Sequence, residues 1–188
     1  MEFINDNRKI TFEEFIVMDN NTEDNLELIN GKVYLLSAPS STHQMIVTKL
    51  STEIGIYLKN KNCIHFVAPF DVYFEEEGQT HKVQPDITVI CDKSGLSEIG
   101  YRAVPVLIIE VLSPSTASKD YIEKMDLYMR IGVKEYWIVS PKNKTVEVFT
   151  LTNEKTYEEP MLFSYPNIIK SSVFEDLSIN SQMIFGII

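Results

Sequence analysis

Cysteine and histidine are scarce in this sequence, which has two cysteines and three histidines among 188 residues. None of them lie close together, so a zinc site is not expected. Cys63 and Cys91 form no CxxC motif, and both fall in strand-like segments. The simplest interpretation is a pair of buried free thiols in a reducing compartment, and we therefore expect a cytoplasmic protein.

Long apolar runs are also missing. The unbroken runs are far shorter than the roughly 20 residues that cross a bilayer, so we expect no membrane segment. The N-terminal residues lack the basic region and apolar stretch of a secretion signal. Without repeats, low-complexity tracts or linkers, residues 1–188 are expected to form a single domain with a sizeable core.

Positive charge is the third deficit. Seventeen Lys and Arg residues face 27 Asp and Glu residues, for a formal net charge of −10. This balance counts against a protein that coats nucleic acid through bulk charge. It still permits an enzyme that contacts phosphates through a bound metal and a few local lysines. No helix-turn-helix, zinc finger or basic arm is present, so the sequence names no target site.

The sequence does contain alternating helix and strand patterns. Three helices are predicted: a short one capped by Thr11, a long one after Pro39, and one that ends at Gly132. Strand patterns include two hairpins, the first turning at Asn30-Gly31 and the second spanning 133–151, and further short strands are expected after residue 153. The fold class is therefore α/β, or mixed α+β, with a central mixed sheet.

One strand pattern contains a charge. Residues 106–112 read Val-Leu-Ile-Ile-Glu-Val-Leu, which is typical of a strand buried on both faces. An unpaired carboxylate at Glu110 would cost several kcal/mol, so a cation, a hydrogen-bond network or a proton must stabilise it.

Two other groups of charges are close to Glu110 in the sequence. Asp86 stands at the head of an apolar strand, and Asp120 and Lys124 have i, i+4 spacing on the helix that follows Glu110. If the strands are neighbours, Asp86 and Glu110 can hold Mg²⁺ or Mn²⁺, while Lys124 orients water or stabilises the transition state of phosphodiester hydrolysis. Asp86 could instead be a turn residue, and Asp120 with Lys124 an exposed ion pair. Tyr121, Lys124, Met125 and Tyr128 share one predicted helical stripe.

Three segments resemble a known family: "LELINGKVYLLSAPSSTHQMIVTKL", "QPDITVI" and "VPVLIIEVLSPSTASKDYIEKMDLYMRIGVKEYWIVSP". They are similar to the Uma-type endonucleases of bacteria, in the PD-(D/E)xK restriction-endonuclease-like superfamily. The resemblance runs in order from about Phe12 to Leu151. It implies a restriction-endonuclease-like core of a mixed sheet flanked by helices, with an extra N-terminal hairpin and C-terminal strands, and a Mg²⁺ site on one side.

The resemblance also assigns roles. Asp86 becomes the first acid of the motif and Glu110 the second, both as metal ligands. The superfamily's usual lysine position is occupied here by Leu112, and the resemblance implies that Lys124 has taken over its role. Glu27 and His43 match family positions too.

These auxiliary residues have several interpretations. Glu27 could be a further metal ligand, and His43 could cap the long helix, contact substrate or transfer a proton. Ser113 is expected to brace the loop after the strand, with a hydroxyl that could reach Glu110, and Asp120 to steady Lys124.

The leading hypothesis is a metal-dependent endonuclease that acts on nucleic acid, most simply DNA, as a homodimer. The alternative is a non-catalytic scaffold or regulator with the same fold, and a third option is a nuclease for small or flexible substrates. The aromatic hairpin with Tyr136 and Trp137 and the strand-rich tail suggest apolar surface for dimerisation. A base-stacking platform and core packing are the other interpretations of these two aromatics.

Overall fold

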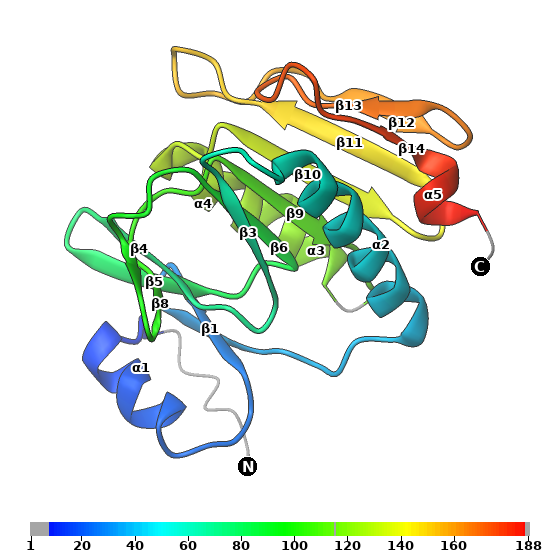
Figure 1. Cartoon of the computed structure of the whole chain (residues 1–188). Coiled ribbons are helices and arrows are strands. Elements are labelled where there is room, and N and C mark those ends of the chain that lie inside the picture. The colour runs from blue at the N-terminus through cyan, green and yellow to red at the C-terminus, as the bar shows by residue number, and fades with distance from the viewer. Residues whose placement is uncertain (1–7, 115, 187–188) are drawn as a thin grey trace.

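The computed structural model describes residues 8–114 and 116–186 and arranges them in β-sheets with helices around them (Figure 1). The strands are β1 (Leu26–Ile29), β2 (Lys32–Leu35), β3 (Ile64–Val67), β4 (Val72–Glu76), β5 (Gln79–Val83), β6 (Ile87–Ile90), β7 (Leu96–Ser97), β8 (Gly100–Tyr101), β9 (Leu107–Val111), β10 (Glu135–Ser140), β11 (Thr145–Thr150), β12 (Met161–Ser164), β13 (Ile168–Lys170) and β14 (Ser178–Asn180). The helical segments are α1 (Phe12–Asp19), α2 (Ser41–Leu58), α3 (Ala117–Lys119), the π-helical turn η1 (Asp120–Lys124), α4 (Met125–Ile131) and α5 (Ser181–Phe185). The predicted mixed α/β class is confirmed.

The central sheet has the strand order β12-β11-β10-β9-β6-β3 and is mixed, because β9 and β10 are parallel while the other neighbours are antiparallel. Helix α2 covers one face, where Ile46 shares a core cluster with Ile109. Helix α4 covers the other, where Leu127 shares a cluster with Ile108. Odd-numbered side chains of β9 therefore face α2, and even-numbered ones, including Glu110, face the side of η1 and α4.

The N-terminal hairpin belongs to a second sheet, with the order β2-β1-β5-β4-β8-β7. Its turn has positive φ at both Asn30 (52°) and Gly31 (76°), as the predicted type I′ turn requires. Strand β1 also pairs with β5 through Leu28 and Lys82. The sequence predicted the hairpin but not the six-stranded sheet that contains it.

The ends of the helices follow from their capping residues. Thr11 forms a capping box with Glu14 at the start of α1, and the Ser40 side chain accepts a hydrogen bond from the His43 N–H at the start of α2. Gly132 ends α4 in the left-handed region, at φ 95°. Of the three options considered for His43, capping of the long helix is wrong, because Ser40 has that role.

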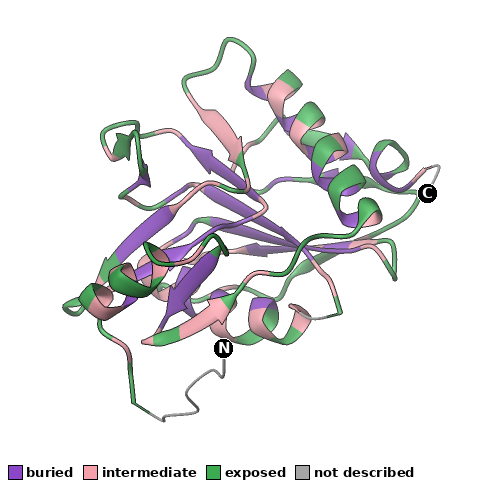
Figure 2. Cartoon of the chain, turned by 90° about the horizontal axis from the view of Figure 1, so that it is seen from below, coloured by how far each residue is buried: buried purple, intermediate pink, exposed green. Residues whose placement is uncertain are grey.

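The interpretation of the aromatic hairpin as a dimer surface or stacking platform is also wrong. Tyr136 and Trp137 are each 0% exposed and pack on opposite faces of the central sheet, so core packing is their role. Figure 2 shows the buried strands inside the molecule, with exposed residues on the outer turns of the helices. The tail contains the predicted short strands. It also contains a helix after the last strand, α5, that the sequence did not predict.

The two cysteines are joined in a disulfide, which corrects the expectation of free thiols. Strands β3 and β6 pair with Ile64 opposite Ile90, so Cys63 and Cys91 fall opposite each other at the next position. Their Cα atoms are 4.0 Å apart. Across the described residues, no helix is both long and apolar enough to cross a membrane.

Candidate active site

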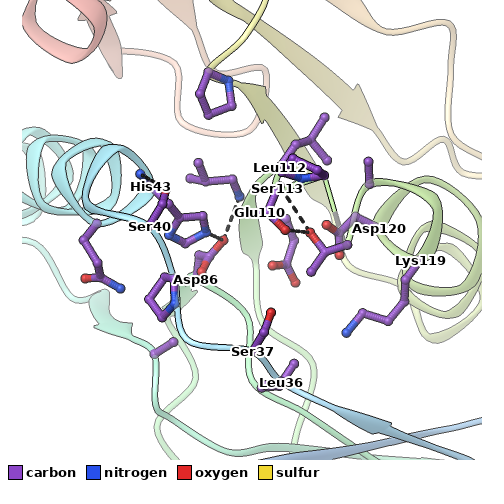
Figure 3. A pocket seen from close by; sticks show the side chains of 18 of the residues that line it. Leu36, Ser37, Ser40, His43, Asp86, Glu110, Leu112, Ser113, Lys119 and Asp120 are labelled. Carbon is purple, nitrogen blue, oxygen red and sulfur yellow. Dashed lines mark hydrogen bonds and ion pairs between the residues drawn. The ribbon is translucent and has the colours of Figure 1, made fainter. Parts of the chain in front are cut away.

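Asp86 and Glu110 lie side by side at one end of the β6–β9 pair. The two strands are antiparallel, with Ile87 opposite Ile109, so the residue before Ile87 lies opposite the residue after Ile109. Opposed residues point to the same face of a sheet. Both side chains line a pocket of about 750 Å³ (Figure 3).

Asp86 is fixed through one of its oxygens. Its Oδ2 accepts a hydrogen bond from the Val111 N–H at 2.7 Å and contacts His43 Nε2 at 3.1 Å. Burial alone would lower the pKa of His43, but the hydrogen bond and charge of Asp86 outweigh burial and raise that pKa. His43 thus acts as a brace for Asp86, reaching it from the first turn of α2.

Glu110 is 4% exposed and is stabilised by two donors on the helix. Its Oε1 accepts hydrogen bonds from Lys124 Nζ at 2.7 Å and from the Tyr128 hydroxyl at 3.1 Å. Burial raises the pKa of Glu110 to about 8, with Lys124 acting in the opposite direction and Asp120 and Asp86 adding to the rise. The cation and hydrogen bonds that a buried carboxylate requires are therefore present, but they do not remove its affinity for a proton.

Lys124 is 3% exposed and lies among carboxylates. Besides Glu110, its ammonium contacts Glu27 Oε1 at 2.9 Å and Asp120 Oδ1 at 3.8 Å. Burial opposes the charge, but Glu110, Glu27 and Asp120 raise the pKa of Lys124 well above its usual range. The alternative of an exposed Asp120–Lys124 ion pair is wrong, since both side chains are buried.

The π-helical turn η1 sets which side chains face the acids. A π-turn takes in more residues than an α-turn, which favours i, i+4 over i, i+3 as the aligned pair. Asp120 is 2% exposed and shares the buried face with Lys124, whereas Tyr121 is 37% exposed and donates a hydrogen bond to Glu147. The predicted stripe through Tyr121 is therefore wrong, because it assumed a regular α-helix.

Glu27 is 0% exposed and both of its oxygens have donors. Oε1 accepts from the Gln84 N–H at 2.9 Å and contacts Lys124, while Oε2 accepts from Lys119 Nζ at 2.6 Å. Burial would raise the pKa of Glu27, but the two lysines lower it below its usual value. In this arrangement Glu27 holds both lysines in place, and the metal-ligand role considered for it stays a prediction.

Ser113 braces the loop after β9. Its hydroxyl lies 3.1 Å from the Thr116 hydroxyl, and its N–H donates to the same oxygen at 3.3 Å. This loop turns the chain from the strand of Glu110 into the helix of Lys124.

The structure brings the predicted site residues together. The pocket is lined by six of them: His43, Asp86, Glu110, Ser113, Asp120 and Lys124. Glu27 is not part of the lining but contacts the Lys124 ammonium. Two contributors have no role in the sequence-based prediction. The predicted stripe includes Tyr128 beside Lys124 but gives it no part in the site. Lys119 has no local signal, because its partner Glu27 is 92 residues away.

Comparison with known proteins agrees with this geometry. The model of the Uma2 family, described as "putative restriction endonuclease", matches residues 12–182. The chain belongs to the Uma2 family. The match includes both strand acids and the lysine-bearing helix.

Two relatives and one solved structure match most of this chain. The uncharacterized protein slr1290 of Synechocystis sp. is 25% identical over 142 residues, covering 75% of this chain and 74% of its own. A second Synechocystis protein, sll1609, is 23% identical over 151 residues, covering 79% and 84%. The crystal structure of "a putative nuclease belonging to DUF820" from Anabaena variabilis superposes with a TM-score of 0.77 at 23% identity, covering 94% of this chain and 97% of that one. The latter likeness shows that this Uma2 chain has the same fold.

Proposed function

We propose that this chain is a metal-dependent endonuclease that hydrolyses phosphodiester bonds of nucleic acid, most simply DNA. The observation that carries the proposal is the placement of Asp86 and Glu110 side by side in one pocket, with the Lys124 ammonium 2.7 Å from Glu110. Membership of the Uma2 family supports the same reaction class.

The two acids suit Mg²⁺ or Mn²⁺. Within residues 8–114 and 116–186, the polar contacts of Asp86 and Glu110 engage Oδ2 and Oε1, so one oxygen of each acid has no protein donor. In the same ranges no group of three or more His, Cys, Asp or Glu side chains is arranged as a metal site. A pair of carboxylates is nevertheless enough for Mg²⁺, which usually keeps several waters and binds substrate phosphate as well.

A bound dication would supply charge to the phosphoryl oxygens and a more acidic water. The protein residues orient the reactants around it. His43 and the Val111 N–H fix Asp86, while Lys124 and Tyr128 fix Glu110. The Lys124 ammonium stays protonated and adds a fixed positive charge where negative charge develops in the transition state.

The decisive experiment incubates the purified protein with supercoiled plasmid, single-stranded DNA and single-stranded RNA, each with Mg²⁺, Mn²⁺ or EDTA. Metal-dependent cleavage by the parent and its loss in Asp86→Asn are expected. Asp176→Asn is the matched control, because Asp176 is exposed and lies in the tail. Absence of cleavage under all conditions, with the protein folded, would favour the non-catalytic scaffold.

We also propose that two copies associate, through the edge of the central sheet and not through the buried hairpin. Strand β12 is the terminal strand of that sheet, and its Met161 and Leu162 are 42% and 60% exposed. An edge strand with apolar side chains is a template for pairing with another strand. Light scattering at micromolar concentration should give a dimer mass for the parent and a monomer mass for Leu162→Lys. A monomer mass for the parent would contradict the proposal.

A further inference from the structure

We infer that Lys119 is a substrate-binding residue, whose ammonium binds a backbone phosphate of the nucleic acid next to the two strand acids. The inference rests on the proposed nuclease function and adds a cation that neither the motif nor the family resemblance assigns. Lys119 is the last residue of α3 and lines the same pocket as Asp86 and Glu110. In Figure 3 its side chain reaches into the pocket from the side opposite His43.

The first step is that Lys124 is not available for this role. Its ammonium donates a hydrogen bond to Glu110 at 2.7 Å and forms ion pairs with Glu27 at 2.9 Å and with Asp120 at 3.8 Å. With 3% of the residue exposed, it acts on its surroundings as a fixed charge. Direct contact between a lysine ammonium of this pocket and a phosphate therefore falls to the other two lysines of the lining, Lys119 or the exposed Lys142.

The second step is that Lys119 has unused donors. In the part of the chain that the structure describes, Glu27 is the carboxylate that its Nζ contacts within ion-pair distance, at 2.6 Å. Its Nζ also lies 5.3 Å from the centre of the Tyr34 ring, a cation–π contact that uses no N–H in a hydrogen bond. The remaining N–H groups are free to bind an anion in the pocket.

The third step is that Lys119 is held in place before any substrate arrives. Glu27 is 0% exposed and links Lys119 to Lys124 through its two oxygens. Tyr34 is a second support for the lysine. A long side chain fixed in this way loses little conformational freedom on binding, which favours its use as a phosphate ligand.

The fourth step is charge balance. With all groups ionised, the four carboxylates of Asp86, Glu110, Asp120 and Glu27 are opposed by three lysines around the pocket, Lys119, Lys124 and Lys142. A dication on the strand acids would leave a net charge of about +1, which one phosphodiester would neutralise. Because the chain as a whole carries a net charge of −10, attraction of the phosphate depends on local donors such as Lys119.

The test measures kcat/KM for cleavage of a short single-stranded DNA of mixed sequence by the parent, Lys119→Gln and Lys59→Gln, over a series of KCl concentrations with Mn²⁺. Lys119→Gln is expected to lower kcat/KM about tenfold, mainly through KM, as loss of one charge-assisted hydrogen bond implies. The slope of log(kcat/KM) against log[KCl] should become shallower by about 0.7, the value for one lost phosphate contact on a single strand. Lys59→Gln is the control. It removes the same charge from an exposed residue at the C-terminal end of α2, and its kcat/KM and salt slope should match those of the parent.

A lysine that only neutralises Glu27 would change stability and leave the salt slope unaltered. A parent-like slope in Lys119→Gln therefore overturns the inference. If that variant does not fold, amine acetylation of the parent decides: adding the DNA should slow modification of Lys119 and not of Lys59, and equal rates overturn the inference. A parent that neither cleaves nor binds DNA or RNA would instead contradict the proposed function itself.

Discussion

Lys124 Nζ and Glu110 Oε1 lie 2.7 Å apart, although the lysine is on a helix and the glutamate is in the strand before it. The two residues are 14 positions apart in the chain. In this molecule the position two residues after the acid is Leu112, which packs against the core cluster on the η1 and α4 side. The ammonium therefore reaches the acid from another element, and the roles of the two groups can be tested separately.

Replacement of Lys124 should affect turnover more than metal binding. Lys124→Met is expected to lower kcat about a hundredfold or more, because it removes a positive charge that acts on the transition state. Mn²⁺ binding, measured by calorimetry, should be unchanged or tighter, since a competing cation is gone. Lys124→Arg should restore little activity, because a planar guanidinium does not reproduce a compact ammonium. Parent-like cleavage by Lys124→Met would rule out the assigned role.

Asp86→Asn should abolish Mn²⁺ binding and leave the fold intact. The amide oxygen can still accept the hydrogen bond from the Val111 N–H that Asp86 Oδ2 accepts at 2.7 Å. What is lost is the negative charge that a hard cation requires. Calorimetric titration of Asp86→Asn and of the control Asp176→Asn with Mn²⁺ measures this loss of binding. Equal heats of binding in the two variants would contradict a metal site at Asp86.

Stability should depend on pH through His81, which is 1% exposed. Burial lowers the pKa of His81 below the usual 6.5, and its Nδ1 accepts a hydrogen bond from the Asn30 N–H. The unfolded chain binds a proton more readily than the folded one, so the stability from neutral His81 is complete above about pH 6.5 and is lost as the pH falls below it.

Urea unfolding at a series of pH values checks this expectation. The free energy of unfolding of the parent should fall more steeply than that of His81→Gln, by up to about 1.4 kcal/mol per pH unit below about pH 6.5. His43 and His65 are present in both proteins, so their contributions cancel in the comparison. If the free energies of unfolding of the parent and of His81→Gln changed in parallel with pH, His81 would have the same pKa in the folded and unfolded chains, and the prediction would be wrong.

The Cys63–Cys91 disulfide should be detectable and stabilising. Protein purified without reductant is expected to show no iodoacetamide-reactive thiol after unfolding. Reduction should lower the free energy of unfolding by about 3 kcal/mol, because the bond closes a loop with a sequence separation of 28. Full alkylation of both cysteines without prior reduction would show that they are free thiols.

Local patterns were enough to predict the parts of the site that lie on neighbouring elements. The apolar run around Glu110 and the apolar strand after Asp86 predicted two strands that, as neighbours, could place both acids on one face, and helical spacing placed Lys124 on the following helix. Hydrophobic periodicity also predicted α2 and both hairpins. These features depend on interactions between residues that are near one another in sequence.

The remaining features depend on pairings that no local pattern encodes. The contact of Glu27 with Lys119 spans 92 residues, and the disulfide depends on the register of β3 against β6. The second sheet arises because β1 pairs with β5 as well as with β2. The burial of Trp137 on a sheet face was one of several outcomes that an alternating strand allows, and only the tertiary packing decides among them.

The π-helical turn between Asp120 and Lys124 has a consequence for how this chain tolerates insertions and deletions. Removing one residue, such as the exposed Ile122, would let the segment close into a regular α-helix at no cost in backbone hydrogen bonds. The same deletion would rotate everything before it by about 100° relative to Lys124. Asp120 and Lys119 would then turn away from the pocket while the helix itself became more regular. The length of this segment therefore determines which charges face the acids, and a change that improves the helix would dismantle the site.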